Sequence, residues 1–210
     1  MDEPRDLLFH EWPMFNQVMT NEHDICRRLL EVVLGEPVDR VRNVEVERTV
    51  EPRLGAKGVR LDAFASTANA VYDVEIQAYT MKELGRRMRY YQSAMDSSAL
   101  RRGQPYRNLA ESYVVFICTE DQFDAALPCI ISKWFAARMR RSIFVMGSIG
   151  GAHYLRLGRP SEGNLRSLLK YVAAGEEDGD ALVADIAAAV RRANGNAVWE
   201  TEGLGHADLY

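Results

Sequence analysis

Residues 58–79 read GVRLDAFASTANAVYDVEIQAY, and they decide how the rest of the chain folds. Two runs that alternate apolar and polar residues flank a short polar turn at 66–71, a pattern that predicts a β-hairpin. A loop of four residues and a loop of two both place Asp62 directly opposite Glu75. Gln77 then points to the same face as Glu75 and lies opposite Arg60.

The facing pair Asp62 and Glu75 is electrostatically unfavourable, because like charges across antiparallel strands repel. The repulsion costs about 1 kcal/mol in bulk water and about 4 kcal/mol in a partly buried cleft. Two interpretations stay open from the residues alone. A cation sits between the carboxylates, or both side chains extend into water while Arg60 reduces the repulsion.

The composition describes an ordinary globular protein without a global basic field. The chain has 210 residues, a net charge of −4, 47% hydrophobic and 27% charged residues, and this charge argues mildly against a tight DNA binder. Cys26, Cys118 and Cys129 have no metal-ligand spacing, which favours reduced thiols. The acidic N-terminus has no apolar signal core, and no window reaches membrane-spanning length, so we expect a cytoplasmic protein with no membrane contact.

Outside the hairpin, the spacing of the apolar residues predicts the other helices and strands. Residues 5–35 have helical spacing, with Asn21 or Thr20 as the cap of a second helix. Residues 42–50 alternate as a strand with Val44, Val46 and Val50 on one face. After Tyr79 the period changes to that of a helix ending near 101–103.

The apolar run at 112–119 has the length of a buried strand, which a strand–helix–strand connection would place parallel to the second hairpin strand. Residues 128–140 predict a further helix, and 143–146 with 152–157 predict a second hairpin. From residue 161 the pattern is helical again, interrupted at 175–179. The order is α-β-β-β-α-β, an α/β (α+β) fold in which helices flank a mixed sheet. We expect one domain at 1–160 and a mixed, helical C-terminal extension at 161–210 packed on it.

Oxygen ligands at the hairpin suit a hard divalent cation, since magnesium typically takes one or two protein carboxylates and keeps several waters. Asp62 and Glu75 supply that number. A third acid on the preceding helix would complete the shell; Glu22 ranks first, ahead of Asp24 and Glu31. Gln77 can orient a water or a phosphate oxygen but carries no charge. Phosphodiester hydrolysis is the reaction class that such a site favours.

The helix after the hairpin combines arginines with tyrosines, which suits contact with a phosphate backbone. Arg87 and Tyr91 are the candidate nucleic-acid-binding residues. The alternative is that the arginines are charged residues on a solvent-exposed helix face and that Tyr91, which stands at core spacing, packs in the interior. No HExxH zinc motif and no nucleophile elbow is found in the chain.

Four segments carry a resemblance to a known family. They are RLDAFA at 60–65, VYDVEIQ at 71–77, RMRYYQSAMDSSALRRGQPYRNL at 87–109 and YVVFICTEDQF at 113–123. Together they resemble the Rpn family of recombination-promoting nucleases and transposases, within the PD-(D/E)XK nuclease superfamily. The likeness extends from about residue 6 to residue 169.

The resemblance implies a magnesium-dependent DNA endonuclease linked to recombination or transposition, with Mn²⁺ as an alternative ion. Asp62 corresponds to the metal-binding aspartate and Glu75 to the acid of the third motif. Gln77 stands where the superfamily more often has lysine, and Glu22 corresponds loosely to the helix glutamate. The competing hypothesis is a catalytically inactive nuclease-like domain that binds nucleic acid or a protein. A homodimer would suit cleavage of both strands.

Overall fold

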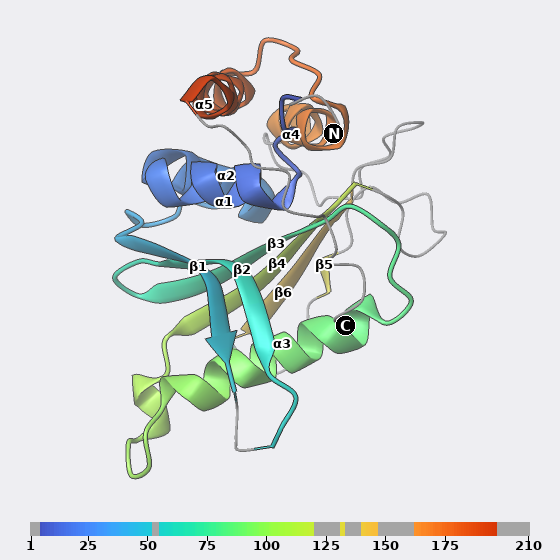
Figure 1. The fold of residues 1–210 in the computed structure, drawn as a ribbon. Coiled ribbons are helices and arrows are strands. Elements are labelled where there is room, and N and C mark those ends of the chain that lie inside the picture. Colours follow the sequence, from blue (N-terminus) through green and yellow to red (C-terminus); the bar gives the residue numbers. More distant parts are fainter. Residues whose placement is uncertain (1–4, 52–54, 120–130, 133–139, 147–161, 197–210) are drawn as a thin grey trace.

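A mixed β-sheet with helices on both faces organises the chain (Figure 1). The structure is a computed structural model that describes residues 5–51, 55–119, 131–132, 140–146 and 162–196. Its elements are α1 (Trp12–Asn21), α2 (His23–Leu34), β1 (Asn43–Val50), β2 (Val59–Ser66), β3 (Ala70–Gln77), α3 (Leu84–Ala99), the 3-10 turn η1 (Tyr106–Asn108), β4 (Glu111–Cys118), β5 (Ile131–Ser132), β6 (Arg140–Met146), α4 (Glu162–Ala174) and α5 (Ala181–Asn196).

The strands follow the order β1-β2-β3-β4-β6-β5. Strands β1, β2 and β3 form an antiparallel meander, whereas β4 joins β3 in parallel and β6 joins β4 in parallel. Helix α3 makes the crossover between β3 and β4, as a parallel connection requires. The predicted α-β-β-β-α-β order and the parallel placement of 112–119 are therefore confirmed.

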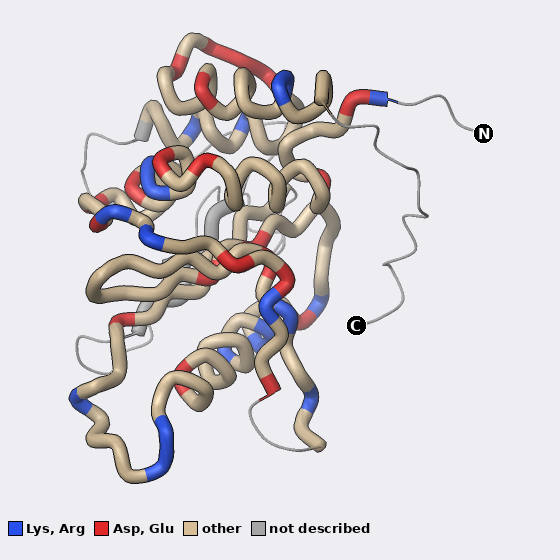
Figure 2. The backbone as a smooth tube through the Cα atoms, turned by 60° about the vertical axis from the view of Figure 1, so that its left-hand side comes forward, with Lys and Arg blue, Asp and Glu red and all other residues tan. Residues whose placement is uncertain are grey.

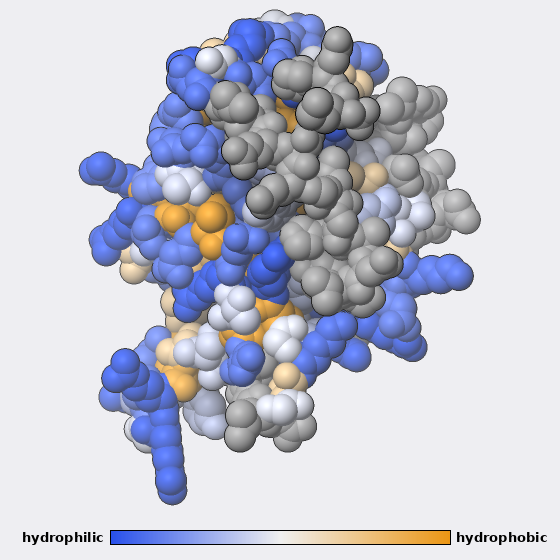
Figure 3. Space-filling view, viewed as in Figure 1, coloured by the Kyte–Doolittle hydropathy of each residue, from blue (hydrophilic) through white to orange (hydrophobic). Residues whose placement is uncertain are grey.

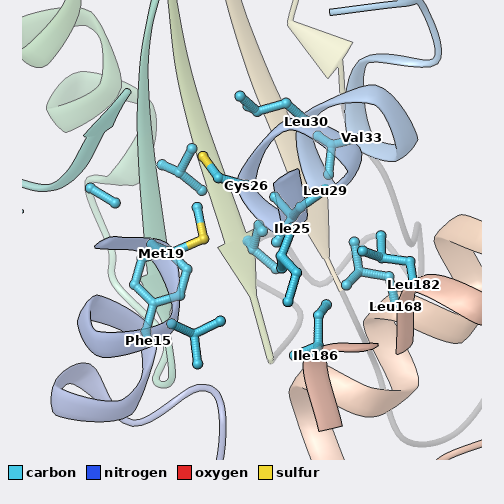
Figure 4. Close-up of a cluster of buried hydrophobic side chains, with 14 of the residues drawn as sticks. Phe15, Met19, Ile25, Cys26, Leu29, Leu30, Val33, Leu168, Leu182 and Ile186 are labelled. Carbon is cyan, nitrogen blue, oxygen red and sulfur yellow. The ribbon is translucent and has the colours of Figure 1, made fainter. Parts of the chain in front are cut away.

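Helices α1 and α2 cover one face of the sheet, and α3 covers the other (Figure 1). On the first face, α1 and α2 pack their apolar sides against the even-numbered residues of β3, such as Tyr72 and Val74. Figure 4 shows this core, with Leu29 and Leu30 of α2 fully buried. Gly35 ends α2 in the left-handed conformation (φ 66°), which a residue without a Cβ adopts at low cost.

The C-terminal helices α4 and α5 form a further layer over α1 and α2 (Figure 1). Asp180 caps α5, since its Oδ1 accepts the backbone N–H groups of Leu182 (2.8 Å) and Val183 (3.1 Å). Leu168 of α4 and Ile186 of α5 are fully buried in the same cluster as Leu29. These helices share the hydrophobic core of the nuclease-like part, while the domain boundary at residue 160 stays a prediction.

The shared core predicts that Ile186→Ala destabilises the whole protein. Truncating a fully buried aliphatic side chain costs about 2–5 kcal/mol, and in a chain of this size each kcal/mol lowers the Tm by about 2–4 °C. Calorimetry should show one cooperative transition at a lower temperature, and Ala184→Ser, on the exposed side of α5, should leave the Tm unchanged. A separate early transition for α4 and α5 would contradict the shared core.

Strands β1 and β2 both change faces where Glu47 and Asp62 stand opposite each other. Val44 contributes to the core under α1 and α2, but Val50 contributes to the core under α3. Glu47 has a φ of 54°, a left-handed conformation that is uncommon for a residue with a Cβ and interrupts the pleat. The expectation that Val44, Val46 and Val50 share one face was therefore wrong.

For the second half of the chain, one expectation was wrong where the structure describes it, and the strand expected at 143–146 was confirmed. Ile131–Ser132 form the short strand β5, antiparallel to β6, rather than part of a helix at 128–140. Residues 143–146 belong to β6, which pairs with β4. The predicted partner segment 152–157 lies outside the described residues.

At the N-terminus, the junction between α1 and α2 differs from the predicted cap. Glu22, rather than Asn21 or Thr20, occupies the N-cap position of α2, and its side chain makes no capping hydrogen bond. Among the helices that the structure describes, none is both long and apolar enough to cross a membrane.

Candidate active site

The β2–β3 hairpin has the predicted register. Its ladder pairs Ala63 with Val74 and Ser66 with Val71, and continuing it places Asp62 opposite Glu75. The backbone N–H of Asp62 donates to Oε1 of Glu75 at 2.8 Å. The two candidate metal ligands therefore meet, beside the point where β2 changes faces.

Glu75 is almost completely buried, with 1% of its surface exposed. Its second carboxylate oxygen, Oε2, accepts a 3.3 Å contact from the Nη2 of Arg87, which α3 places beneath the sheet. Both oxygens of Glu75 thus have partners that hold the carboxylate in one orientation. Asp62 is less buried, and the backbone N–H of Ile76 hydrogen-bonds to its carboxylate.

Asp73 is a third acid of this site that the sequence reasoning did not single out. It lies two residues before Glu75 on β3, so its side chain points to the same face. Asp73 has no exposed surface, and neither carboxylate oxygen has a hydrogen-bond donor among the described residues. The alternation D-x-E-x-Q at 73–77 was the signal that could have found it. We call Asp62, Asp73 and Glu75 the acid cluster.

The acid cluster carries more negative charge than its surroundings balance. Burial raises the pKa of Asp62 to about 6, although the charges of Arg87 and Arg60 oppose the shift. Burial and the neighbouring carboxylates raise the pKa of Asp73 and Glu75 well above their usual range. Asp73 and Glu75 lie close enough for a hydrogen bond, which exists only while one of them is protonated.

Arg87 and Tyr91 lie inside the site rather than on an open surface. The guanidinium of Arg87 stands over the rings of Tyr91 (4.9 Å) and Phe116 (5.5 Å), and its Nη2 donates to the Tyr91 hydroxyl at 2.7 Å. Tyr91 is 4% exposed. The structure brings both residues to the acid cluster, and their contact with nucleic acid stays a prediction.

Gln77 continues the same face of β3 and is buried. Its Nε2 donates to the carbonyl oxygen of Tyr79 at 3.0 Å, which fixes the orientation of the amide. Arg60, expected opposite Gln77, instead forms a 3.2 Å ion pair with Glu47 and lies over the Trp12 ring at 5.8 Å. Its charge still lowers the pKa of Asp62, but the alternative in which both carboxylates extend into water was wrong, since Glu75 is buried.

The three helix acids proposed for the metal shell have other partners. Glu22 pairs with Arg192 of α5 at 2.6 Å. Asp24 and Glu31 both pair with Arg27, at 2.8 and 2.6 Å. None of these acids is among the charges that shift the pKa of Asp62 or Glu75.

A residue of the first helix that reaches the backbone of Asp62 is Asn16 of α1, which is buried. In the amide orientation that satisfies both of its polar atoms, it donates to the Asp62 carbonyl oxygen (3.2 Å) and accepts from Trp12 Nε1 (3.0 Å). This contact ties α1 to the backbone of the candidate metal ligand. The sequence offered no sign of it, because a lone asparagine within a helix is unremarkable.

The donor set fits a hard divalent cation. Carboxylate oxygens are the ligands that Mg²⁺ and Mn²⁺ prefer, and the buried Asp73 oxygens, which have no hydrogen-bond donor among the described residues, could accept from a water bound to such a cation. Among the described residues, no group of three or more His, Cys, Asp and Glu side chains is arranged to hold a metal ion. Asp62 and Glu75 stay the two candidate ligands, with Arg87 against Glu75, and their binding of a metal stays a prediction.

Comparison with known proteins agrees with this fold and assigns the segment that contains the hairpin to a family. A family model described as PD-(D/E)XK nuclease family transposase matches residues 12–135, which include α1, the whole hairpin, α3 and β4. No curated protein and no solved structure matches the chain. The match covers more than half of the sequence and confirms the resemblance to the nuclease superfamily. The chain belongs to the PD-(D/E)XK nuclease family transposases.

Proposed function

We propose that this chain is a magnesium-dependent endonuclease that hydrolyses phosphodiester bonds of DNA during recombination or transposition. The observation that carries the proposal is the hydrogen-bonded pair of Asp62 and Glu75 inside the acid cluster. Membership of a nuclease family supports the reaction class. An excess of buried carboxylates is what a site for a divalent cation requires.

Asp62 and Glu75 would hold the cation, Mg²⁺ or Mn²⁺. When bound, such an ion neutralises charge that develops on a phosphate and lowers the pKa of a coordinated water. The chain contributes a fixed geometry. The Asp62 N–H holds one oxygen of Glu75, and Arg87 holds the other.

Gln77 and Arg87 have different tasks in this proposal. The amide of Gln77, anchored on Tyr79, can orient a water or a phosphate oxygen through hydrogen bonds. Because an amide does not take up a proton at neutral pH, the proton of an attacking water must pass to a carboxylate or to solvent. Arg87 keeps a positive charge beside the scissile phosphate, where negative charge increases in the transition state.

The second candidate function is a catalytically inactive nuclease-like domain that binds nucleic acid or a protein. Two features favour it: a glutamine stands where the superfamily more often has lysine, and Arg87 already contacts a candidate ligand. A plasmid assay separates the two. We expect Mg²⁺-dependent nicking by the wild type and none with chelator present; nicking no faster than that of Asp62→Ala would leave only the binding function.

Calorimetric titration tests the metal site without requiring activity. We expect one Mn²⁺ per chain to bind to the wild type, and we expect binding to be lost in Glu75→Ala.

Sedimentation of the protein with and without DNA tests the predicted homodimer, since cleavage of both strands calls for two active sites.

A further inference from the structure

Positive charge gathers in one part of an otherwise acidic chain. Residues 84–110, which run from the start of α3 to the start of β4, contain six arginines, one aspartate and no lysine or glutamate. The whole chain nevertheless has a net charge of −4. A local field of this sign attracts phosphate even when the net charge of the protein does not.

The segment after α3 presents its charges and one ring to solvent. Arg101, Arg102 and Arg107 are exposed, and Tyr106 has 86% of its surface exposed. An aromatic side chain this exposed contributes almost nothing to the core, so folding does not account for it.

The backbone of this segment is nevertheless ordered. The Arg101 N–H donates to Gln104 Oε1 at 2.7 Å, and Gly103 turns the chain with a φ of 86°. The 3-10 turn η1 then sets the direction of Tyr106 through the bond from the Leu109 N–H to the Tyr106 carbonyl at 3.0 Å. A preformed turn that displays a ring costs less entropy on binding than a flexible one.

The arginines of this surface differ from the other two arginines of residues 84–110. Arg86 and Arg87, at the other end of α3, pair with Glu83 and Glu75. Arg89, Arg101, Arg102 and Arg107 form no ion pair with any carboxylate that the structure describes. Guanidinium groups of this kind can bind phosphate oxygens without first breaking an internal contact.

We propose that Arg89, Arg101, Arg102, Tyr106 and Arg107 form a DNA-binding strip, in which the arginines contact phosphates and Tyr106 stacks on an unpaired base. Figure 2 shows two basic segments on the loop after α3 at the lower left, and Figure 3 shows hydrophilic side chains that project there. The strip begins on the solvent side of α3, because Arg89 lies half a turn after Arg87 and is exposed where Arg87 faces the sheet. It ends about 20 Å farther along α3, or about six base steps of duplex.

This inference rests on the proposed function for its choice of DNA, and the chemistry of the strip supports that choice. A surface for an acidic protein needs charge and an apolar centre that excludes water. Here an exposed ring lies among guanidinium groups, the combination that single-stranded nucleic acid uses for backbone contact and stacking. The strip would hold a single-stranded stretch of the substrate along the solvent side of α3 and the loop that follows it.

Fluorescence anisotropy with a labelled single-stranded DNA oligonucleotide, in EDTA, measures the strip without catalysis. We expect the triple change Arg101→Ala, Arg102→Ala and Arg107→Ala to weaken binding by about tenfold or more and to reduce the salt slope by about 2. Tyr106→Ala should weaken binding about 5- to 150-fold, and more for single strands than for duplex, whereas Tyr106→Phe retains the wild-type affinity.

The matched control removes the same charge from another surface: Arg166→Ala, Lys170→Ala and Arg191→Ala on α4 and α5, where all three residues are exposed. Wild-type affinity in the strip variants, or an equal loss in the control, overturns the inference. Binding that depends on the strip without any cleavage overturns the proposed nuclease function alone. An acidic polypeptide is the competitor that tests for a protein partner. If it displaces the DNA from the wild type and binds equally well to Tyr106→Ala, the strip binds a protein instead, and the inference is overturned.

Discussion

Glu75→Gln and Asp62→Asn should each lower Mg²⁺-dependent cleavage by on the order of 10³-fold, because each removes one of the two charges that would hold the cation. Both changes preserve the shape of the side chain. The Asp62 N–H can still donate to the oxygen of a glutamine at position 75, which limits the structural disturbance. Single-turnover cleavage of a labelled duplex, with Mn²⁺ titration alongside, measures the two consequences together.

A matched change elsewhere separates loss of the metal from loss of any acid. Glu22→Gln should retain cleavage within about twofold, since the structure pairs Glu22 with Arg192 on the far side of α1 and α2. A loss in Glu22→Gln as large as that in Glu75→Gln would restore Glu22 as the helix acid of the shell. Cleavage retained in both Glu75→Gln and Asp62→Asn would remove these residues from the mechanism.

The hairpin could be predicted from the sequence because its constraints are local. Alternation fixes which side chains share a face, and a short turn fixes the register, so the meeting of Asp62 and Glu75 followed from counting residues. The parallel placement of β4 followed in the same way, since a helical crossover permits little else.

Features that depend on packing could not be predicted from the same patterns. The face change at Glu47 depends on one positive φ, which no residue preference at that position announces. Arg87 reads as one of several arginines on a wet helix, and only the packing of α3 against Phe116 shows that it is the one beneath the sheet. The sequence allowed Tyr91 to be either a packed residue or an exposed one, and only its burial in the structure shows that it is packed.

Asp73 is a different case, because the period of two already placed it beside Glu75. Repulsion between carboxylates that face each other across strands singles out Asp62 and Glu75, but it does not single out a carboxylate that precedes Glu75 by two residues on the same strand. The omission has an energetic consequence, since Asp73 is the most buried acid of the cluster and the one whose oxygens have no donor among the described residues.

Asp73→Asn should therefore stabilise the metal-free protein. A carboxyl at position 73 can share a hydrogen bond with Glu75 only while one of the two is protonated, whereas an asparagine amide donates to Glu75 without that proton, and relieving the buried carboxyl is worth about 1–3 kcal/mol. We expect the Tm at pH 7.5 to rise by about 2–10 °C in EDTA. Asp6→Asn, at an exposed position, should leave the Tm unchanged, and a lower Tm in Asp73→Asn would show that the aspartate has a stabilising partner.

The pH dependence of this gain has a definite sign. A carboxyl group whose folded pKa is raised binds its proton more tightly in the folded state, so stability falls as pH rises from the ordinary pKa to the raised one. For Asp62 that window extends from about 4 to about 6, and for Asp73 and Glu75 it extends higher. The wild type in EDTA should therefore melt at a lower temperature at pH 7.5 than at pH 5, and the advantage of Asp73→Asn should shrink at pH 5.

Mg²⁺ should reduce the same advantage at pH 7.5, because a cation bound by Asp62 and Glu75 offsets the repulsion that makes Asp73 costly. An advantage that persists unchanged in Mg²⁺ would mean that no cation enters the acid cluster.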